Sequence, residues 1–119
     1  MAFLPDLDAL VQRYADAWNA SDPDQRWQLV HGVTAPDVTF VDPRETAPVT
    51  GQAALTAFLG LLHEQLGQRF ELDGPVDAHH GWLRVRWRLS GNGAASSGLL
   101  VGALDAERRL THIVHFLDA

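Results

Sequence analysis

The chain has 119 residues, of which 46% are hydrophobic and 20% are charged, a composition typical of one globular domain with a single core. Its formal net charge of −6 argues against a nucleic-acid partner, because binding a phosphate backbone requires a basic face. The absence of cysteine excludes disulfides, thiol catalysis and thiolate metal sites.

The start of the chain, "MAFLPDLDAL", has neither a basic region nor a long apolar run, so it does not predict a signal peptide. The longest apolar stretch, "GLLVGAL", is too short to span a bilayer. We therefore expect a cytoplasmic protein with no membrane partner.

Two helices are predicted first. Apolar residues recur at helical spacing between residues 5 and 20. Asp22 as a cap, Pro23 at the first helical position and Gln25 completing a capping box are typical of a helix start. The apolar face of this second helix is expected to contain Trp27, Val30 and Val33.

A strand, "APDVTFVDP", and a third helix follow. Thr50 is expected to cap this helix, which should run over residues 52–66. Its apolar stripe is formed by Leu55, Phe58, Leu59, Leu62 and Leu66.

After Gly67 the apolar period changes to two, which predicts strands. The segments are "QRFELDGPVDA", "GWLRVRWRLSG", "SSGLLVGALDA" and "RRLTHIVHFLD", joined by connections of turn length. Three helices with one strand among them, followed by a four-stranded antiparallel meander, indicate an α+β fold.

The strand over residues 82–89 has two chemically different faces. Its apolar face, which should point to the helices, consists of Leu83, Val85, Trp87 and Leu89. The other face carries Trp82, Arg84, Arg86 and Arg88. We expect this arginine face to be solvated or buried in a dimer.

The order of these elements, with "VQRYADAWNASD", "PDVTFVDP" and "RRLTHIVHFLD" as its clearest pieces, resembles the nuclear transport factor 2-like superfamily. This superfamily includes ketosteroid isomerase, limonene epoxide hydrolase and the SnoaL-like polyketide cyclases. The resemblance implies three helices packed on a curved, mostly antiparallel sheet that forms a cone with an apolar pocket. It also implies a homodimer through the outer face of the sheet.

The resemblance to ketosteroid isomerase places two residues. Tyr14 stands where the isomerase tyrosine donates a hydrogen bond to the substrate oxyanion, and Asp42 stands where the acid before proline is the general base. Such a pair would move a proton between carbons beside a carbonyl group. The isomerase's second oxyanion acid would fall in "SSGLLVGAL", which holds no acid.

The ending "HFLD" resembles that of limonene epoxide hydrolase, but His115 replaces the hydrolase's acid. No acid accompanies Arg84 and Arg86 in the manner of the hydrolase's charged pair, which argues against epoxide hydrolysis. His115 and His112 lie three apart on a strand and therefore point to opposite faces, so they cannot bind one metal ion together. The comparison implies that His115 faces the pocket.

Asp42 has two interpretations: a pocket base whose pKa is raised by apolar neighbours, or an acid that accepts backbone hydrogen bonds in its own turn. Tyr14 is either a donor or a core residue with a satisfied hydroxyl, and His115 is either an acid/base partner or a hydrogen-bonded cavity residue. The expected ligand-contacting side chains are Trp18, Trp27, Phe40, Phe58, Leu62, Val85, Trp87 and Ile113.

The leading prediction is a pocket that binds a small, apolar, carbonyl-containing molecule, with isomerase- or cyclase-type proton transfer by Asp42, Tyr14 and His115. No cofactor or metal is expected, because the sequence has neither a phosphate-binding glycine loop nor a cluster of metal ligands. The alternative is a non-catalytic ligand-binding or dimerisation module of the same fold.

Overall fold

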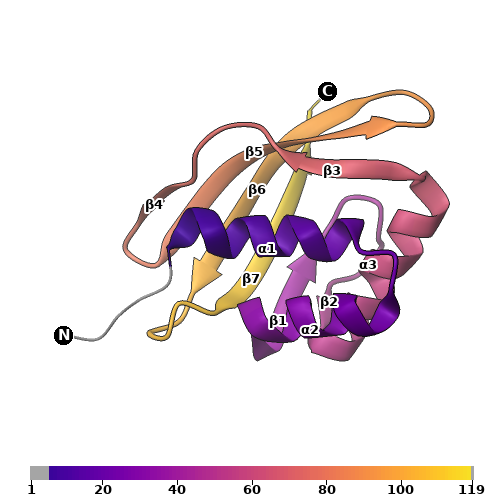
Figure 1. Ribbon diagram of the computed structural model, residues 1–119. Helices are drawn as coiled ribbons and strands as arrows, with labels where there is room; N and C mark the ends of the chain where they lie inside the picture. The colour runs from indigo at the N-terminus through magenta and orange to yellow at the C-terminus, as the bar shows by residue number, and fades with distance from the viewer. Residues whose placement is uncertain (1–5, 119) are drawn as a thin grey trace.

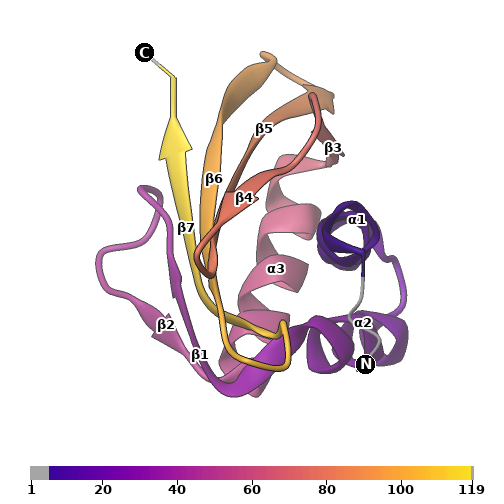
Figure 2. The ribbon, with the colours of Figure 1, turned by 90° about the vertical axis from the view of Figure 1, so that its left-hand side faces the viewer.

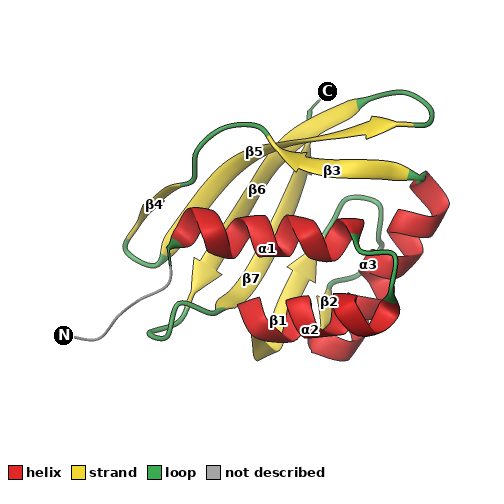
Figure 3. Ribbon diagram, in the orientation of Figure 1, coloured by secondary structure: helices red, strands yellow, loops and turns green. Residues whose placement is uncertain are grey.

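A computed structural model describes residues 6–118 and shows helices packed on a sheet (Figures 1 and 3). The helices are α1 (Leu7–Asn19), α2 (Pro23–Val33) and α3 (Gln52–Leu66). The strands are β1 (Thr34–Val41), β2 (Val49–Thr50), β3 (Gln68–Leu72), β4 (Asp77–His79), β5 (Trp82–Gly91), β6 (Ser96–Leu104) and β7 (Leu110–Leu117). The predicted α+β class is confirmed.

The strands form one curved sheet in the order β2-β1-β7-β6-β5-β3, with β4 also paired to β5. All three helices lie on the same side of this sheet, and α1 runs across it (Figures 1 and 2). The core therefore lies between α1, α3 and the inner face of the sheet. None of the helices in the described range is long and apolar enough to cross a membrane.

The helix starts follow from their capping residues. The Asp6 side chain accepts a hydrogen bond from the Asp8 amide at the start of α1. Asp22 accepts from the amides of Asp24 and Gln25 in α2, as predicted, and Pro23 occupies the first helical position. Residue 5, where the sequence pattern began, lies outside the described residues.

The third helix has the predicted bounds but a different start. Gly51, with φ of 93°, is its N-terminal flanking residue, and no side chain caps the helix. Thr50 is instead part of the short strand β2, where it pairs with Thr39. The prediction that Thr50 caps α3 was therefore wrong, because strand pairing takes up this residue.

The buried face of α2 differs from the prediction at one position. Arg26 is buried together with Val30 and Val33, whereas Trp27 is 40% exposed. Arg26 points inward because its guanidinium donates hydrogen bonds to backbone carbonyls at the end of α1. Placing Trp27 on the apolar face was thus wrong by one residue, which is about 100° around a helix.

The meander is confirmed, with antiparallel pairing of β3 with β5, β5 with β6, and β6 with β7. The predicted first strand is interrupted after Leu72, so that β3 and β4 both pair with β5. The first strand in the chain, β1, lies parallel to β7 and antiparallel to β2, which is the strand at that edge of the sheet. The predicted alternation in β5 is confirmed, with its arginines outward and its apolar side chains buried.

One glycine shapes the inner face of the sheet. Gly98 in β6 lies opposite Trp87 in β5, and a Cβ atom at Gly98 would come within 2.4 Å of the Trp87 ring and 1.9 Å of the Phe116 carbonyl oxygen. Only glycine leaves this space open. The large indole of Trp87 can therefore lie over β6.

Candidate functional site

A buried polar cluster joins α1 to the last strand. Trp18 Nε1 donates a hydrogen bond to the Tyr14 hydroxyl oxygen at 2.9 Å, because these residues lie one helical turn apart on the buried face of α1. The same hydroxyl lies 2.9 Å from Nε2 of His115 in β7. All three side chains are buried, so this polar contact lies inside the core.

The hydrogen bonds assign the protonation states in this cluster. Burial raises the pKa of Tyr14 far above its ordinary value and lowers the pKa of His115 to about 3, so both groups are neutral at pH 7. The Tyr14 oxygen accepts from Trp18, so its own hydrogen is best used as a donor to His115 Nε2. His115 then carries its hydrogen on Nδ1.

Aromatic rings surround His115. Its ring centroid lies 5.4 Å from that of Phe40, 5.7 Å from Phe70 and 5.6 Å from Trp87. Within the described structure, His115 Nδ1 and Trp87 Nε1 are buried nitrogens without a hydrogen-bond partner. Two such groups on adjacent rings are unusual, because a buried polar group without a partner costs ~1–3 kcal/mol.

Asp42 lies at the edge of this cluster and forms an ion pair with Arg44. Its carboxylate oxygens accept from Arg44 Nε at 2.7 Å and from Nη2 at 2.6 Å, and the Arg44 backbone amide adds a bond of 2.9 Å. Asp42 is only 3% exposed. Burial alone would raise the pKa of this carboxyl, but the hydrogen bonds from Arg44 hold it below its ordinary value.

The structure confirms the second interpretation of Asp42, an acid that accepts hydrogen bonds in its own turn. Its carbonyl also binds the Glu45 amide in this turn. Its charge is also close enough to His115 to oppose the fall of that group's pKa. The expectation of a raised Asp42 pKa was wrong, because Arg44 was not foreseen as its partner.

Arg44 covers one side of the cluster. Its guanidinium carbon lies 5.5 Å from the centre of the Trp18 ring, within the range of a cation–π contact. Its side chain is about one-fifth exposed, whereas the Asp42 side chain is fully buried. Arg44 is thus the partly exposed member of the ion pair and lies against Trp18.

The structure brings most of the predicted residues together. Tyr14 and His115 are hydrogen-bonded, and the Asp42 charge acts on His115 from nearby. The apolar members of the same core are Trp18, Phe40, Phe58, Leu62, Val85, Trp87 and Ile113. Trp27 lies apart on the exposed side of α2, with its ring 5.6 Å from that of His31. His112 is exposed, as its spacing from His115 predicted.

Sequence reasoning missed two members of the site. Arg44 follows Asp42 by two residues, a spacing that suits a local ion pair. The periodicity of apolar residues gives no direction for the Arg44 side chain, because it follows the end of the strand. Phe70 stacks on Trp18 with ring centroids 4.8 Å apart and also contacts Trp87. Its place as an apolar residue in the alternating segment "QRFEL" was the available signal. On β6, the inward residues beside the cluster are Gly98 and Leu100, so the second oxyanion acid is absent there.

Comparisons with known proteins agree with this architecture. The sequence profile of the SnoaL-like domain matches residues 11–117. A SnoaL-like family protein from Agrobacterium tumefaciens strain C58, for which an isomerase activity has been suggested, is 33% identical. It superposes with a TM-score of 0.83 over 93% of this chain and 96% of its own. No curated protein matches the sequence.

More distant structures share the fold. One from Jannaschia sp. CCS1, suggested to be a SnoaL-like polyketide cyclase, has a TM-score of 0.76 and 18% identity over 92% of this chain and 83% of its own. Another from Kribbella flavida, suggested to be a ketosteroid isomerase, has a TM-score of 0.69 and 18% identity. The match covers 93% of this chain and 76% of the other. The chain belongs to the SnoaL-like domain family, within the nuclear transport factor 2-like superfamily.

Proposed function

We propose that the aromatic interior binds a small, largely apolar carbonyl compound, and that Asp42 moves a proton beside that carbonyl group without a cofactor. The observation that carries the proposal is the pair of buried nitrogens, His115 Nδ1 and Trp87 Nε1, on adjacent rings. Both are N–H donors, and a carbonyl oxygen is the acceptor that would match them in an apolar setting.

These two donors would stabilise the oxyanion, as the second acid does in ketosteroid isomerase. Charge develops on the carbonyl oxygen when a neighbouring carbon loses a proton, and positioned donors stabilise that charge. The Tyr14 hydroxyl polarises the His115 ring through the bond to Nε2, which supports donation from Nδ1. In this scheme Tyr14 acts through His115 and is a positioning residue.

Arg44 controls the base. While Arg44 is bound, the lowered pKa of Asp42 makes the carboxylate a weak base. If an apolar ligand displaces the partly exposed Arg44 side chain, Asp42 loses the hydrogen bonds that lower its pKa. Burial of the carboxylate then raises that pKa. Ligand binding and activation of the base are thereby coupled, and the displaced guanidinium gains water.

Replacing Trp87 with Phe tests the binding site, because it removes the N–H donor and keeps an aromatic ring. We expect Trp87→Phe to weaken binding of a cyclic ketone about tenfold, the effect of one hydrogen bond to a polar acceptor in a buried site. The matched control is Trp82→Phe on the outer face of the sheet, where the ring is 55% exposed. Affinities would be measured by isothermal titration calorimetry with a panel of cyclic ketones.

Equal affinities of the Trp87→Phe and Trp82→Phe variants for every ketone that binds would contradict the proposed donor role. Loss of folding in Trp87→Phe is checked by near-ultraviolet circular dichroism. If that variant does not fold, His115→Gln tests the other member of the donor pair, because it removes the imidazole Nδ1–H.

We also propose that a second copy of the chain covers the outer face of the sheet, as expected for this superfamily. Each arginine of β5 is already paired within the protomer, to Asp77, Asp118 and Glu71. The face therefore carries little free charge. Strand pairing aligns apolar side chains in two neighbouring rows, one of Val41, Val114 and Val101 and one of Leu99 and Phe116.

A charge placed in one of these rows should separate the two copies. We expect Phe116→Glu to be monomeric under conditions where the wild type is dimeric, because Phe116 is 54% exposed in the protomer and would lie at the interface. Trp27→Glu on α2 is the matched control and should stay dimeric. Size-exclusion chromatography with light scattering gives the masses. A monomeric wild type would contradict this proposal and leave ligand binding as the function.

A further inference from the structure

A groove between α2 and α3 lies apart from the aromatic interior. It has a volume of about 520 Å³ and is formed by the start of α2 and one side of α3. Arg26 and Ser21 contribute polar groups to it from one side, and Gly60 and Leu61 line it from α3. The proposed function does not use any of these residues.

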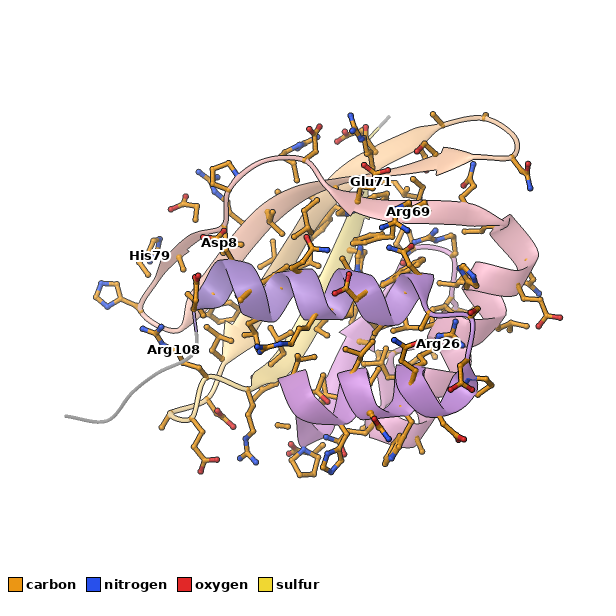
Figure 4. The ribbon with its side chains drawn as sticks, viewed as in Figure 1. Asp8, Arg26, Arg69, Glu71, His79 and Arg108 are labelled. Atoms are coloured by element: carbon orange, nitrogen blue, oxygen red, sulfur yellow. The ribbon has the colours of Figure 1, made fainter. Side chains whose placement is uncertain are left out.

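Arg26 is the unusual member of this groove. It is only 6% exposed and lies between the end of α1 and the start of α2 (Figure 4). Its Nε donates to the Ala17 carbonyl at 3.0 Å, and its Nη2 donates to the Ala20 carbonyl. These two bonds satisfy carbonyl groups that the end of α1 leaves free.

The third guanidinium nitrogen, Nη1, has no hydrogen-bond partner among residues 6–118, and the guanidinium forms no ion pair with them. It lies directly beside Gly60, where a Cβ atom would be only 3.0 Å away. A buried arginine remains charged, and burial lowers its pKa although the nearby Asp22 carboxylate opposes that fall. An anion in the groove would offset the cost of this burial.

The rest of the groove indicates what kind of anion fits. The Ser21 hydroxyl can donate a further hydrogen bond, whereas Thr56 already donates to the Gln52 carbonyl. Leu61 is 49% exposed and, with Ala57, gives the groove an apolar wall. An acidic group attached to a short apolar body would match both parts.

We propose that this groove binds a small carboxylate with a short apolar body, its carboxylate on Arg26 Nη1 and Ser21 and its body on Leu61. A guanidinium nitrogen and a hydroxyl are suited to the two oxygens of a carboxylate. Glu64 also lines the groove and makes no ion pair with Arg26, so its negative charge limits the affinity for anions. This site is independent of the proposed chemistry at Asp42.

The test is a titration of the ¹⁵N-labelled chain with octanoate, followed by two-dimensional NMR. We expect saturable shifts of the Gly60 amide and the Arg26 side-chain N–H, and at least tenfold weaker binding of octanol, which lacks the charge. Glu64→Gln should bind octanoate about threefold more tightly, because it removes a repulsive charge near the groove.

A variant that leaves Arg26 in place avoids disturbing the end of α1. Thr56→Glu puts a carboxylate into the groove and should weaken octanoate binding at least tenfold. Ala53→Glu adds the same charge to an exposed position of α3 outside the groove and should bind octanoate as the wild type does. Equal loss in both variants, equal binding of octanol, or no saturable shift would each overturn the proposal.

Octanoate shifts confined to the Trp87 indole would also overturn the groove site, because they would place the carboxylate in the aromatic interior. Failure of the groove does not affect the ketone site, whose measured quantity is ketone affinity in the Trp87→Phe variant. The two proposals can therefore fail separately.

Discussion

Arg44→Ala is expected to lower the free energy of unfolding by about 3 kcal/mol at pH 7, because it leaves a buried carboxylate without its partner. Asp42 is 3% exposed, and both of its oxygens bind the Arg44 side chain. A surface ion pair would contribute less than about 1 kcal/mol. Urea unfolding of the two proteins measures the difference.

The pH dependence should distinguish this cause from a loss of packing. In the wild type the Asp42 pKa is lowered, so its contribution to stability is present above the unfolded pKa of about 3.9 and is lost as pH falls through the folded pKa. In Arg44→Ala, burial raises the Asp42 pKa above the unfolded value. This variant therefore loses stability as pH rises from about 4, and the difference between the two proteins should be larger at pH 7 than at pH 4.

The double variant Asp42→Asn/Arg44→Ala is the matched control. It removes the charge together with its partner and should recover most of the loss at pH 7, since the asparagine side-chain oxygen can still accept from the backbone amide of residue 44. A loss in Arg44→Ala that is the same at both pH values, and that the double variant does not recover, would assign the effect to packing of Arg44 on Trp18.

The sequence predicted the elements that depend on local chemistry. The bounds of α3, the start of α2 at Asp22 and Pro23, and the two faces of β5 follow from capping and periodicity, and the structure confirms them. The parallel pairing of β1 with β7 depends on residues about 70 positions apart, so no local pattern contains it. The same holds for the burial of Arg26, which is caused by carbonyl groups at the end of another helix.

The sequence could predict which residues belong to the site but not their protonation or hydrogen-bond partners. Tyr14, Asp42 and His115 were identified by resemblance, and the structure brings them to one cluster. Their protonation depends on side-chain contacts that sequence spacing leaves undetermined. Arg44 reverses the expected direction of the Asp42 pKa, and Trp18 donates a hydrogen bond to the Tyr14 hydroxyl that was expected to serve a ligand.

Asp42→Asn should abolish proton transfer while preserving binding. If Asp42 is the base, the variant should lower the turnover of a β,γ-unsaturated cyclic ketone by about 10²–10⁴-fold, the usual contribution of a general base. Its ketone affinity should stay within a few-fold of the wild type, because the donors at His115 and Trp87 are unchanged. Ultraviolet absorbance of the conjugated product measures turnover, and calorimetry measures binding.

Arg44→Lys provides the comparison that isolates the base. It keeps a positive charge beside Asp42 but loses the two-point contact, so the base is released more readily and turnover should be maintained or raised. Turnover in Asp42→Asn equal to that of the wild type would exclude Asp42 as the base. Loss of ketone binding together with turnover would instead make Asp42 part of the structure of the site, and Arg44 would then serve only to keep a buried carboxylate paired.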